Sequence, residues 1–177
     1  DNMAIHKIDG VDAVDGGSQI SSFPKKFVTL HCFGAVTKGD WVAIDLNSAD
    51  ASKNGLGATC EKSTAALPDL VFGVATETLT ASGELKVQTA GLYGDDTQGG
   101  GATVHADTEA GDFLVADPAT AGQAVPVDNN VAVAGNSHAQ IKTALKAARV
   151  GIALRDDATG DYDAGETTVM IIDQGYF

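Results

Sequence analysis

Short apolar runs separated by turn-forming residues make up most of this chain. Several runs are rich in β-branched and aromatic residues, and residues 85–89 alternate apolar and polar positions strictly. Clusters of Gly, Asp, Asn and Ser bound the runs, which is typical of antiparallel β-sheets. The pattern predicts an all-β fold, with strands near residues 27–33, 41–45, 70–75, 85–89, 113–116, 131–133, 150–154 and 167–172.

One segment has helical rather than strand periodicity. Ile141, Leu145 and Ala148 recur at the spacing that places side chains on one face of an α-helix. Basic residues gather toward the end of this segment, where they complement the negative end of the helix dipole. We therefore predict one short helix over about residues 137–149.

An internal repeat is the most informative feature of the sequence. Four blocks recur in the same order, and the offset between matching blocks grows only from 72 to 84 residues. Each repeat predicts a small β unit, and two units predict a single β domain over 27–177, with repeats at about 34–93 and 106–177. The fold expected is a small β-barrel or a sandwich. The matching blocks are 39–45 with 111–117, 71–75 with 149–153, 82–87 with 164–169, and 91–93 with 175–177.

Glycines occupy matching positions of the two repeats. A Gly-Asp step precedes the strand in each repeat, at Gly39 and at Gly111, and predicts a tight turn that leads into the strand. Gly73 and Gly151 lie inside the next expected strands, where the missing side chain permits a bulge or the close approach of another group. Trp41 follows the first turn at the position that Phe113 occupies in the second repeat, so we expect Trp41 in the core.

The first 26 residues lie outside the repeat and are expected to form an extended N-terminal arm. Scattered apolar residues along this arm have little bulk between them, which is typical of a segment that orders against a partner. An ordinary frayed terminus or an edge strand is the alternative. The candidate contact residues are Ile5, Ile8, Val11, Val14, Phe23 and Pro24.

Composition and charge exclude several classes of function. Of the 177 residues, 28 are Ala and 21 are Gly, so the expected core is thin and made of small side chains. No apolar run approaches the length of about 18 residues that a membrane span requires. The formal net charge of −13 repels the phosphates of nucleic acid and anionic lipid, so we expect neither as a direct partner.

No motif in the sequence predicts catalysis or a bound cofactor. His31 and Cys32 are adjacent, so on a strand they point to opposite faces and cannot form a direct dyad. Cys32 and Cys60 fit neither a CxxC motif nor a disulfide scaffold, and we expect two small buried thiols. The acidic segment 156–166 offers oxygen ligands for calcium, but its spacing does not match an EF-hand loop. We therefore predict no catalytic, cofactor or metal site.

Three segments of the first repeat resemble a known family. They are residues 36–45 with the sequence VTKGDWVAID, residues 71–77 with VFGVATE, and residues 82–92 with SGELKVQTAGL. Their order is similar to that in the head decoration, or capsid cement, proteins of tailed bacteriophages. The resemblance implies a small β-barrel or tulip-like fold on the outside of the capsid, often as trimers. Residues 110–177 show the same pattern more loosely.

The resemblance leads to a functional expectation. It implies a structural virion protein, not an enzyme, that binds the major capsid protein on the outer capsid surface. The chain would join neighbouring capsid subunits, as a homo-oligomer and most simply a homotrimer, and so resist the pressure of packaged DNA. The alternative is a carbohydrate- or cell-binding β module of a virion fibre or surface adhesin, and a small β-rich hydrolase is the third possibility.

Overall fold

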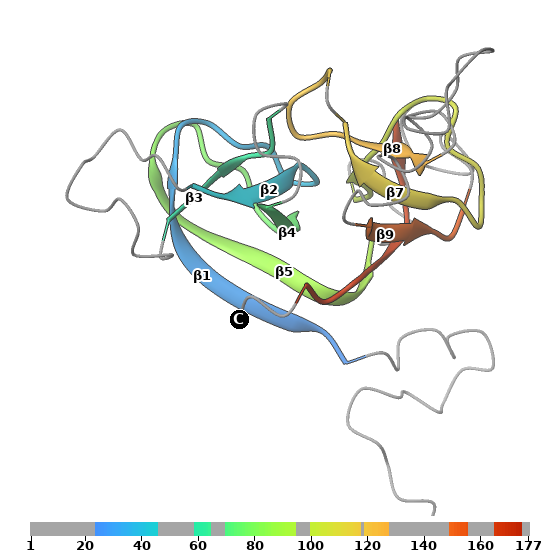
Figure 1. Ribbon diagram of the computed structural model, residues 1–177. Coiled ribbons are helices and arrows are strands. Elements are labelled where there is room, and N and C mark those ends of the chain that lie inside the picture. Colours follow the sequence, from blue (N-terminus) through green and yellow to red (C-terminus); the bar gives the residue numbers. More distant parts are fainter. Residues whose placement is uncertain are drawn as a thin grey trace, which may run out of the picture.

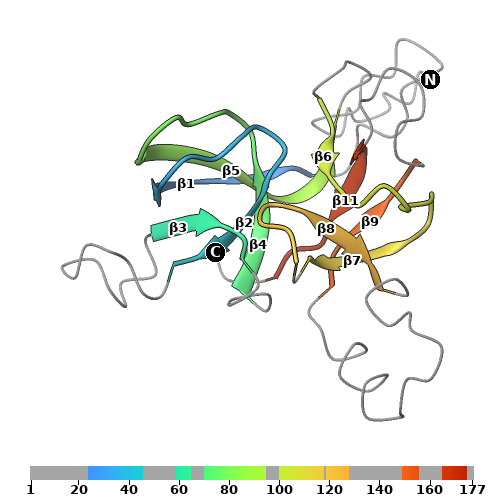
Figure 2. The same cartoon turned by 90° about the horizontal axis from the view of Figure 1, so that it is seen from above.

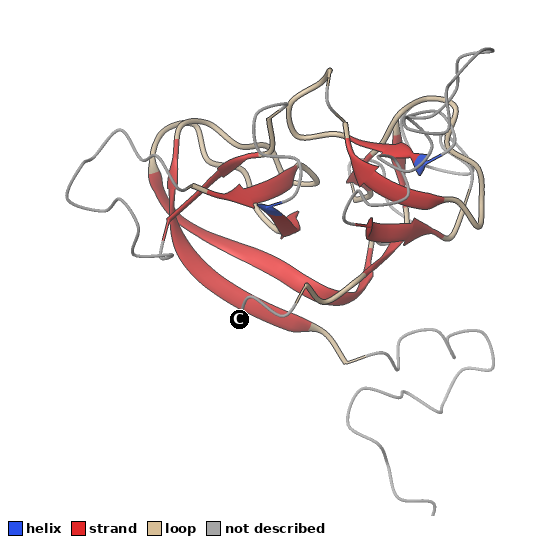
Figure 3. Cartoon of the chain, in the orientation of Figure 1, coloured by secondary structure: helices blue, strands red, loops and turns tan. Residues whose placement is uncertain are grey.

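The computed structural model describes residues 24–45, 59–64, 70–94, 100–117, 119–127, 149–155 and 165–174. Strands dominate this part of the chain (Figure 3). Within it, no helix is long and apolar enough to cross a membrane. The strands are β1 (Lys26–Phe33), β2 (Trp41–Ile44), β3 (Thr59–Lys62), β4 (Val71–Ala75), β5 (Gly83–Tyr93), β6 (Ala102–Thr103), β7 (Phe113–Ala116), β8 (Ala124–Pro126), β9 (Arg149–Ala153), β10 (Glu166–Thr167) and β11 (Val169–Ile171).

The first five strands form a closed barrel. Their order is β1-β3-β2-β4-β5, and β1 also pairs with β5, which closes the ring. Every neighbouring pair in the ring is antiparallel except β1 with β3. The predicted all-β barrel is thus confirmed. The barrel interior is apolar, with Leu30, Cys32, Val36, Val42, Ile44, Cys60, Phe72, Ala75, Leu85 and Val87 in one cluster.

The sheet continues beyond the barrel through the long strand β5. Strand β11 pairs with the end of β5, and the order then runs β11-β9-β7-β8. We call the barrel the first half and these four strands the second half. The two halves lie side by side, joined below by β5 and β11 (Figures 1 and 2). The short strands β6 and β10 form a separate two-stranded sheet.

Strand pairing in the two halves follows the offsets of the sequence repeat. In the first half, Trp41 lies opposite Val74 and Val42 opposite Gly73, and the register then shifts. In the second half the matching residues pair in the same way, and the register shifts at the same place. The matching pairs are Phe113 with Ile152 and Leu114 with Gly151, then Ala75 with Val87 and Ala153 with Val169.

The Gly-Asp turns of the two halves also share their geometry. Gly39 and Gly111 have φ angles of 95° and 99°, in the left-handed region that glycine adopts without strain. One carboxylate oxygen of Asp40 accepts a hydrogen bond from the backbone N–H of Thr37 at 2.7 Å. Asp112 accepts the equivalent bond from Glu109 at 2.9 Å. The predicted tight turns are therefore present in both halves.

A second apolar core lies between the halves. Alternate residues of β2 point out of the barrel, so Trp41 and Ala43 pack with Leu114 and Val150 of the second half. The indole N–H of Trp41 donates a hydrogen bond to the carbonyl of Thr103 at 3.0 Å. Trp41 is fully buried, as expected. The second half therefore completes its core with the outer face of the barrel.

Two expectations from the sequence need correction. Lys26 belongs to β1, opposite Ala90, and not to the arm, because its backbone pairs with β5. Arg149 begins β9 and does not end a helix, because it pairs with Val115 in the sheet. The rest of the predicted helix, and the strand expected at 131–133, lie outside the described residues. Strands β3, β6 and β8 were not predicted.

Candidate binding surface

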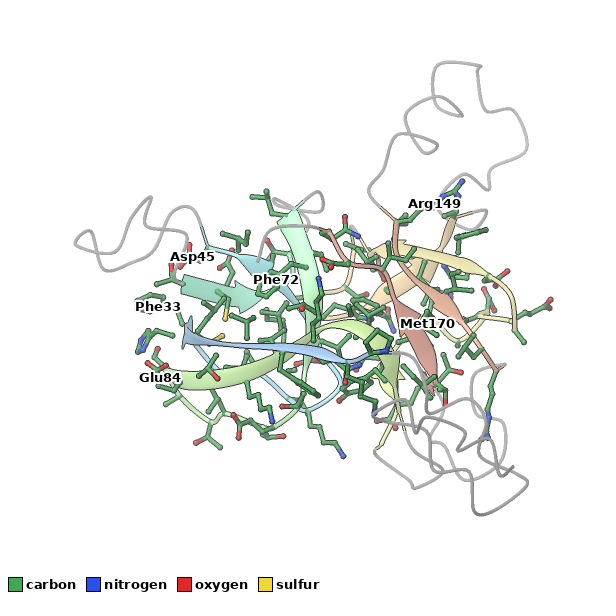
Figure 4. All side chains as sticks on the ribbon, turned by 90° about the horizontal axis from the view of Figure 1, so that it is seen from below. Phe33, Asp45, Phe72, Glu84, Arg149 and Met170 are labelled. Carbon is green, nitrogen blue, oxygen red and sulfur yellow. The ribbon has the colours of Figure 1, made fainter. Side chains whose placement is uncertain are left out.

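An apolar row crosses the outer face of the second half. Phe113 lies opposite Ile152, Ile152 opposite Met170, and Met170 opposite Leu92, so one residue from each of four neighbouring strands contributes. Phe113 is 41% exposed, and the other three are half-buried. Met170 is labelled in Figure 4. We call these four residues the outer row.

A cationic side chain borders the outer row. The guanidinium of Arg149 lies 4.3 Å from the centre of the Phe113 ring. Such a contact between a cation and an aromatic face is attractive and orients both groups. The amide nitrogen of the Gln174 side chain donates to the carbonyl of Arg149 at 2.7 Å. The row therefore presents an aromatic ring with a positive charge beside it, on a chain of net charge −13. Arg149 is labelled in Figure 4.

The equivalent row in the first half is buried. Trp41 lies opposite Val74, and Val74 opposite Gln88. These residues match Phe113, Ile152 and Met170 of the outer row by register, yet their exposures are 0%, 0% and 3%. The second half covers them, since Trp41 and Val74 belong to the core between the halves. The same face is thus covered within the chain in one half and open in the other.

The N-terminal arm leaves the barrel beside the last member of the outer row. Gly91 precedes Leu92 and has a φ of 87°, and a Cβ placed on it would lie 2.7 Å from the carbonyl oxygen of Pro24. Lys26 forms an ion pair with Asp173, just beyond β11. The start of β1 is therefore fixed at the end of β5 where the two halves meet.

Of the six residues that the sequence suggested as contacts, the structure describes one. Pro24 is exposed, at the point where the described chain begins. Ile5, Ile8, Val11, Val14 and Phe23 lie outside the described residues. The outer row was not predicted: the repeat aligned Phe113 with the buried Trp41 but gave no signal that Phe113 would be exposed.

A second exposed aromatic residue differs from the outer row in its surroundings. Phe27 on β1 is 47% exposed, and the ammonium of Lys86 lies 4.5 Å from its ring centre. Its partner across the sheet is the buried polar residue Gln88. Phe27 thus has the same kind of cation contact as Phe113, but no apolar row continues from it.

The described residues contain no group of three or more His, Cys, Asp or Glu side chains placed to hold a metal ion. His31 and Cys32 do point to different faces of β1, as expected. Cys32 is buried in the barrel, whereas the His31 ring packs edge-on against Phe33 with 4.9 Å between ring centres. Of the acidic segment considered for calcium, only Gly165 and Glu166 are described, and Glu166 pairs with Thr103 in the small sheet.

Both cysteines are free thiols with no exposed surface, which confirms the expectation of small buried thiols. Their mutual position was not predicted. Cys32 on β1 lies directly opposite Cys60 on β3. The sequence gave no signal for this, because β3 was not expected to be a strand.

Comparison with known proteins identifies no relative. No protein-family model matches the sequence, and no curated protein matches it significantly.

Proposed function

We propose that this chain is a structural virion protein that binds the outer surface of a phage capsid and joins neighbouring major capsid subunits. The observation that carries the proposal is the outer row, which stays exposed although its counterpart in the first half is buried. In this proposal the row and the N-terminal arm are the contacts with the shell. The protein acts mechanically, by holding subunits together against the pressure of packaged DNA, and turns over no substrate.

The chemistry of the outer row fits a protein partner. Apolar surface contributes about 25 cal/mol for each Å² removed from water, before the costs of association. A row of four side chains is a small contact by that measure. Many copies on one shell, each joining several subunits, make small contacts sufficient through multivalency. Assembly as a homotrimer, which the family resemblance implies, brings three such rows to one site.

The described aromatic residues favour this proposal over a carbohydrate-binding module. Sugar sites use exposed Trp or Tyr side chains, whose polar groups hydrogen-bond while the rings stack. Trp41 is fully buried, and Tyr93 is 4% exposed. The large exposed aromatic residues in the described part of the chain are Phe27 and Phe113.

Binding to particles tests the proposal directly. The full chain is mixed with phage heads that lack it, the heads are sedimented, and the pellet is imaged at low resolution. We expect saturable binding, with added density on the outer surface between capsid subunits, and heads that retain DNA to a higher temperature. A chain that stays in the supernatant with heads, but binds a glycan array, would overturn the proposal in favour of the adhesin alternative.

A further inference from the structure

Two thiols meet at the one parallel strand pair of the barrel. Cys32 on β1 and Cys60 on β3 are direct partners in the register, flanked by His31 with Thr59 and Phe33 with Glu61. Both cysteines have no exposed surface and belong to the same core cluster. The two side chains therefore point into the barrel, next to each other.

The geometry of this strand pair suits a disulfide. Neighbouring strands lie about 4.7–4.9 Å apart, which falls within the Cα separation of about 4.4–6.8 Å found in disulfides. Because both side chains point to the same side, the sulfur atoms need only side-chain rotation to approach. No displacement of the barrel backbone is required by this spacing.

The two thiols also differ in their chemistry. A hydrogen bond with the Cys60 thiol lowers the pKa of Cys32, against the opposing effect of burial. The same hydrogen bond, together with burial, raises the pKa of Cys60. The thiolate is the reactive form of cysteine, and these opposite shifts favour it at Cys32.

We propose that Cys32 and Cys60 are a redox pair that forms a disulfide across β1 and β3 when the chain meets hydrogen peroxide. The Cys32 thiolate attacks one peroxide oxygen, the O–O bond breaks, and the released hydroxide takes a proton to become water. Cys32 is then a sulfenic acid. The Cys60 sulfur attacks the Cys32 sulfur, its proton leaves with the hydroxyl group as a second water, and the S–S bond forms. Two thiols are oxidised by two electrons, and one peroxide is reduced to two waters.

The disulfide would join β3, a strand of only four residues, to its neighbour β1. Strand β3 pairs with β1 through three residues and with β2 through three residues. A covalent bond between β1 and β3 restricts the unfolded chain and ties β3 to its neighbour. Because both thiols are buried, peroxide reaches them only during transient local openings of the barrel, so oxidation is slower than for an exposed cysteine.

Oxidation of the full chain by peroxide tests this proposal. The folded protein is incubated with hydrogen peroxide, then denatured, alkylated and weighed by mass spectrometry. We expect the loss of both alkylatable thiols in a monomer, a mass decrease of about 2 Da, and reversal by dithiothreitol. The melting temperature of the oxidised chain should rise by about 5–10 °C.

Two variants test whether both cysteines are needed for the disulfide. Cys60→Ala and Cys32→Ala each leave a single thiol, so oxidation of either variant should stop at a sulfenic acid, which a cyclic 1,3-dicarbonyl reagent traps. Peroxide should raise the melting temperature of neither variant. Where either variant fails to fold, the wild-type cycle of peroxide and dithiothreitol still decides. Two thiols that remain alkylatable in folded wild type, disulfides only between chains, or an oxidised chain that melts at a lower temperature would each overturn the proposal.

Discussion

At the scale of single residues, the close contact of Trp41 with Gly151 joins the two halves. A Cβ placed on Gly151 would lie 3.0 Å from the Cη2 atom of Trp41 and 3.1 Å from the carbonyl oxygen of Met170. The indole therefore occupies the space that a side chain on β9 would need. Gly73, at the matching position of the first half, instead makes room for the backbone of β5, since a Cβ there would clash with the carbonyl oxygen of Gln88. The glycine repeated inside these two strands therefore makes room for a side chain in one half and for a backbone in the other.

Substitution of Gly151 should loosen the contact between the halves. We expect Gly151→Ala to lower the free energy of unfolding by about 1–3 kcal/mol, because the tryptophan or β11 must move to accept the methyl group. Chemical denaturation followed by tryptophan fluorescence measures this. Gly83→Ala is the matched control, since a Cβ at Gly83 would meet only a Leu79 methyl carbon, at 3.9 Å. Equal stability of the two variants would contradict this account of Gly151.

Glu61 gives the stability of the barrel a dependence on pH. Burial and the nearby Asp45 raise the pKa of the Glu61 carboxyl. The folded state therefore holds this proton more tightly than the unfolded state, whose pKa is about 4.3. As pH rises from the unfolded value through the raised folded value, ionisation of Glu61 costs stability.

Replacing Glu61 removes this cost. We expect Glu61→Gln to melt above wild type at pH 7, by a few degrees at most because the side chain is only half-buried, with no gain below about pH 4. Thermal melts of both proteins across this range measure the difference. Glu109→Gln, at an exposed carboxylate, is the control and should change little at either pH. A gain of the same size at pH 4 and pH 7 would show that ionisation is not the cause.

At the scale of strands, the sequence predicted those elements whose apolar residues form continuous runs. Residues such as Val71, Phe72 and Val74 are buried on both faces of β4, so their run is unbroken and the strand is visible. Strand β3 has the sequence Thr-Cys-Glu-Lys, and β8 contains Pro126, so neither has a strand signal. Both strands form because they pair with a neighbouring strand, β3 with β2 and β8 with β7. Tertiary pairing therefore determines them, and local strand propensity does not.

The same limit applied to the candidate site. The repeat located Phe113, because it aligns with Trp41, but alignment alone assigned both residues the same surroundings. Burial differs because the second half packs on β2 and covers Trp41, whereas Phe113 on the matching face of β7 stays 41% exposed. Which half covers the other depends on the path of β5 between them, and single-sequence patterns carry no information on that path.

The N-terminal arm can be tested as an element. Deleting residues 1–20 should abolish occupancy on phage heads while the body keeps its melting temperature, because β1 and its contacts begin only at Lys26. Sedimentation with heads measures the first quantity, and a thermal melt the second. Unchanged occupancy would remove the arm from the proposed contact, and a large fall in melting temperature would instead assign it a role in folding.

At the scale of the whole molecule, the fold is a closed barrel with four further strands of the same sheet packed on its outer face. The barrel closes on itself through β1 and β5, whereas the second half borrows the face of β2 and β4 to complete its core. This arrangement buries one copy of the repeated face and leaves the other open. A chain rich in Ala and Gly can therefore fold around two small cores and still present an apolar surface.

The central claim is that this open face, the outer row, is where the chain docks on a capsid. The most direct test compares Phe113→Asp with Phe27→Asp, two exposed phenylalanines that each lie against a cationic side chain. Both variants are first shown to melt like wild type, and their occupancy on phage heads lacking the protein is then measured by sedimentation. We predict that Phe113→Asp weakens binding to the heads at least about tenfold, equivalent to about 1.4 kcal/mol of binding free energy, while Phe27→Asp binds as wild type does. Full occupancy by Phe113→Asp, or an equal loss in both variants, would contradict the account.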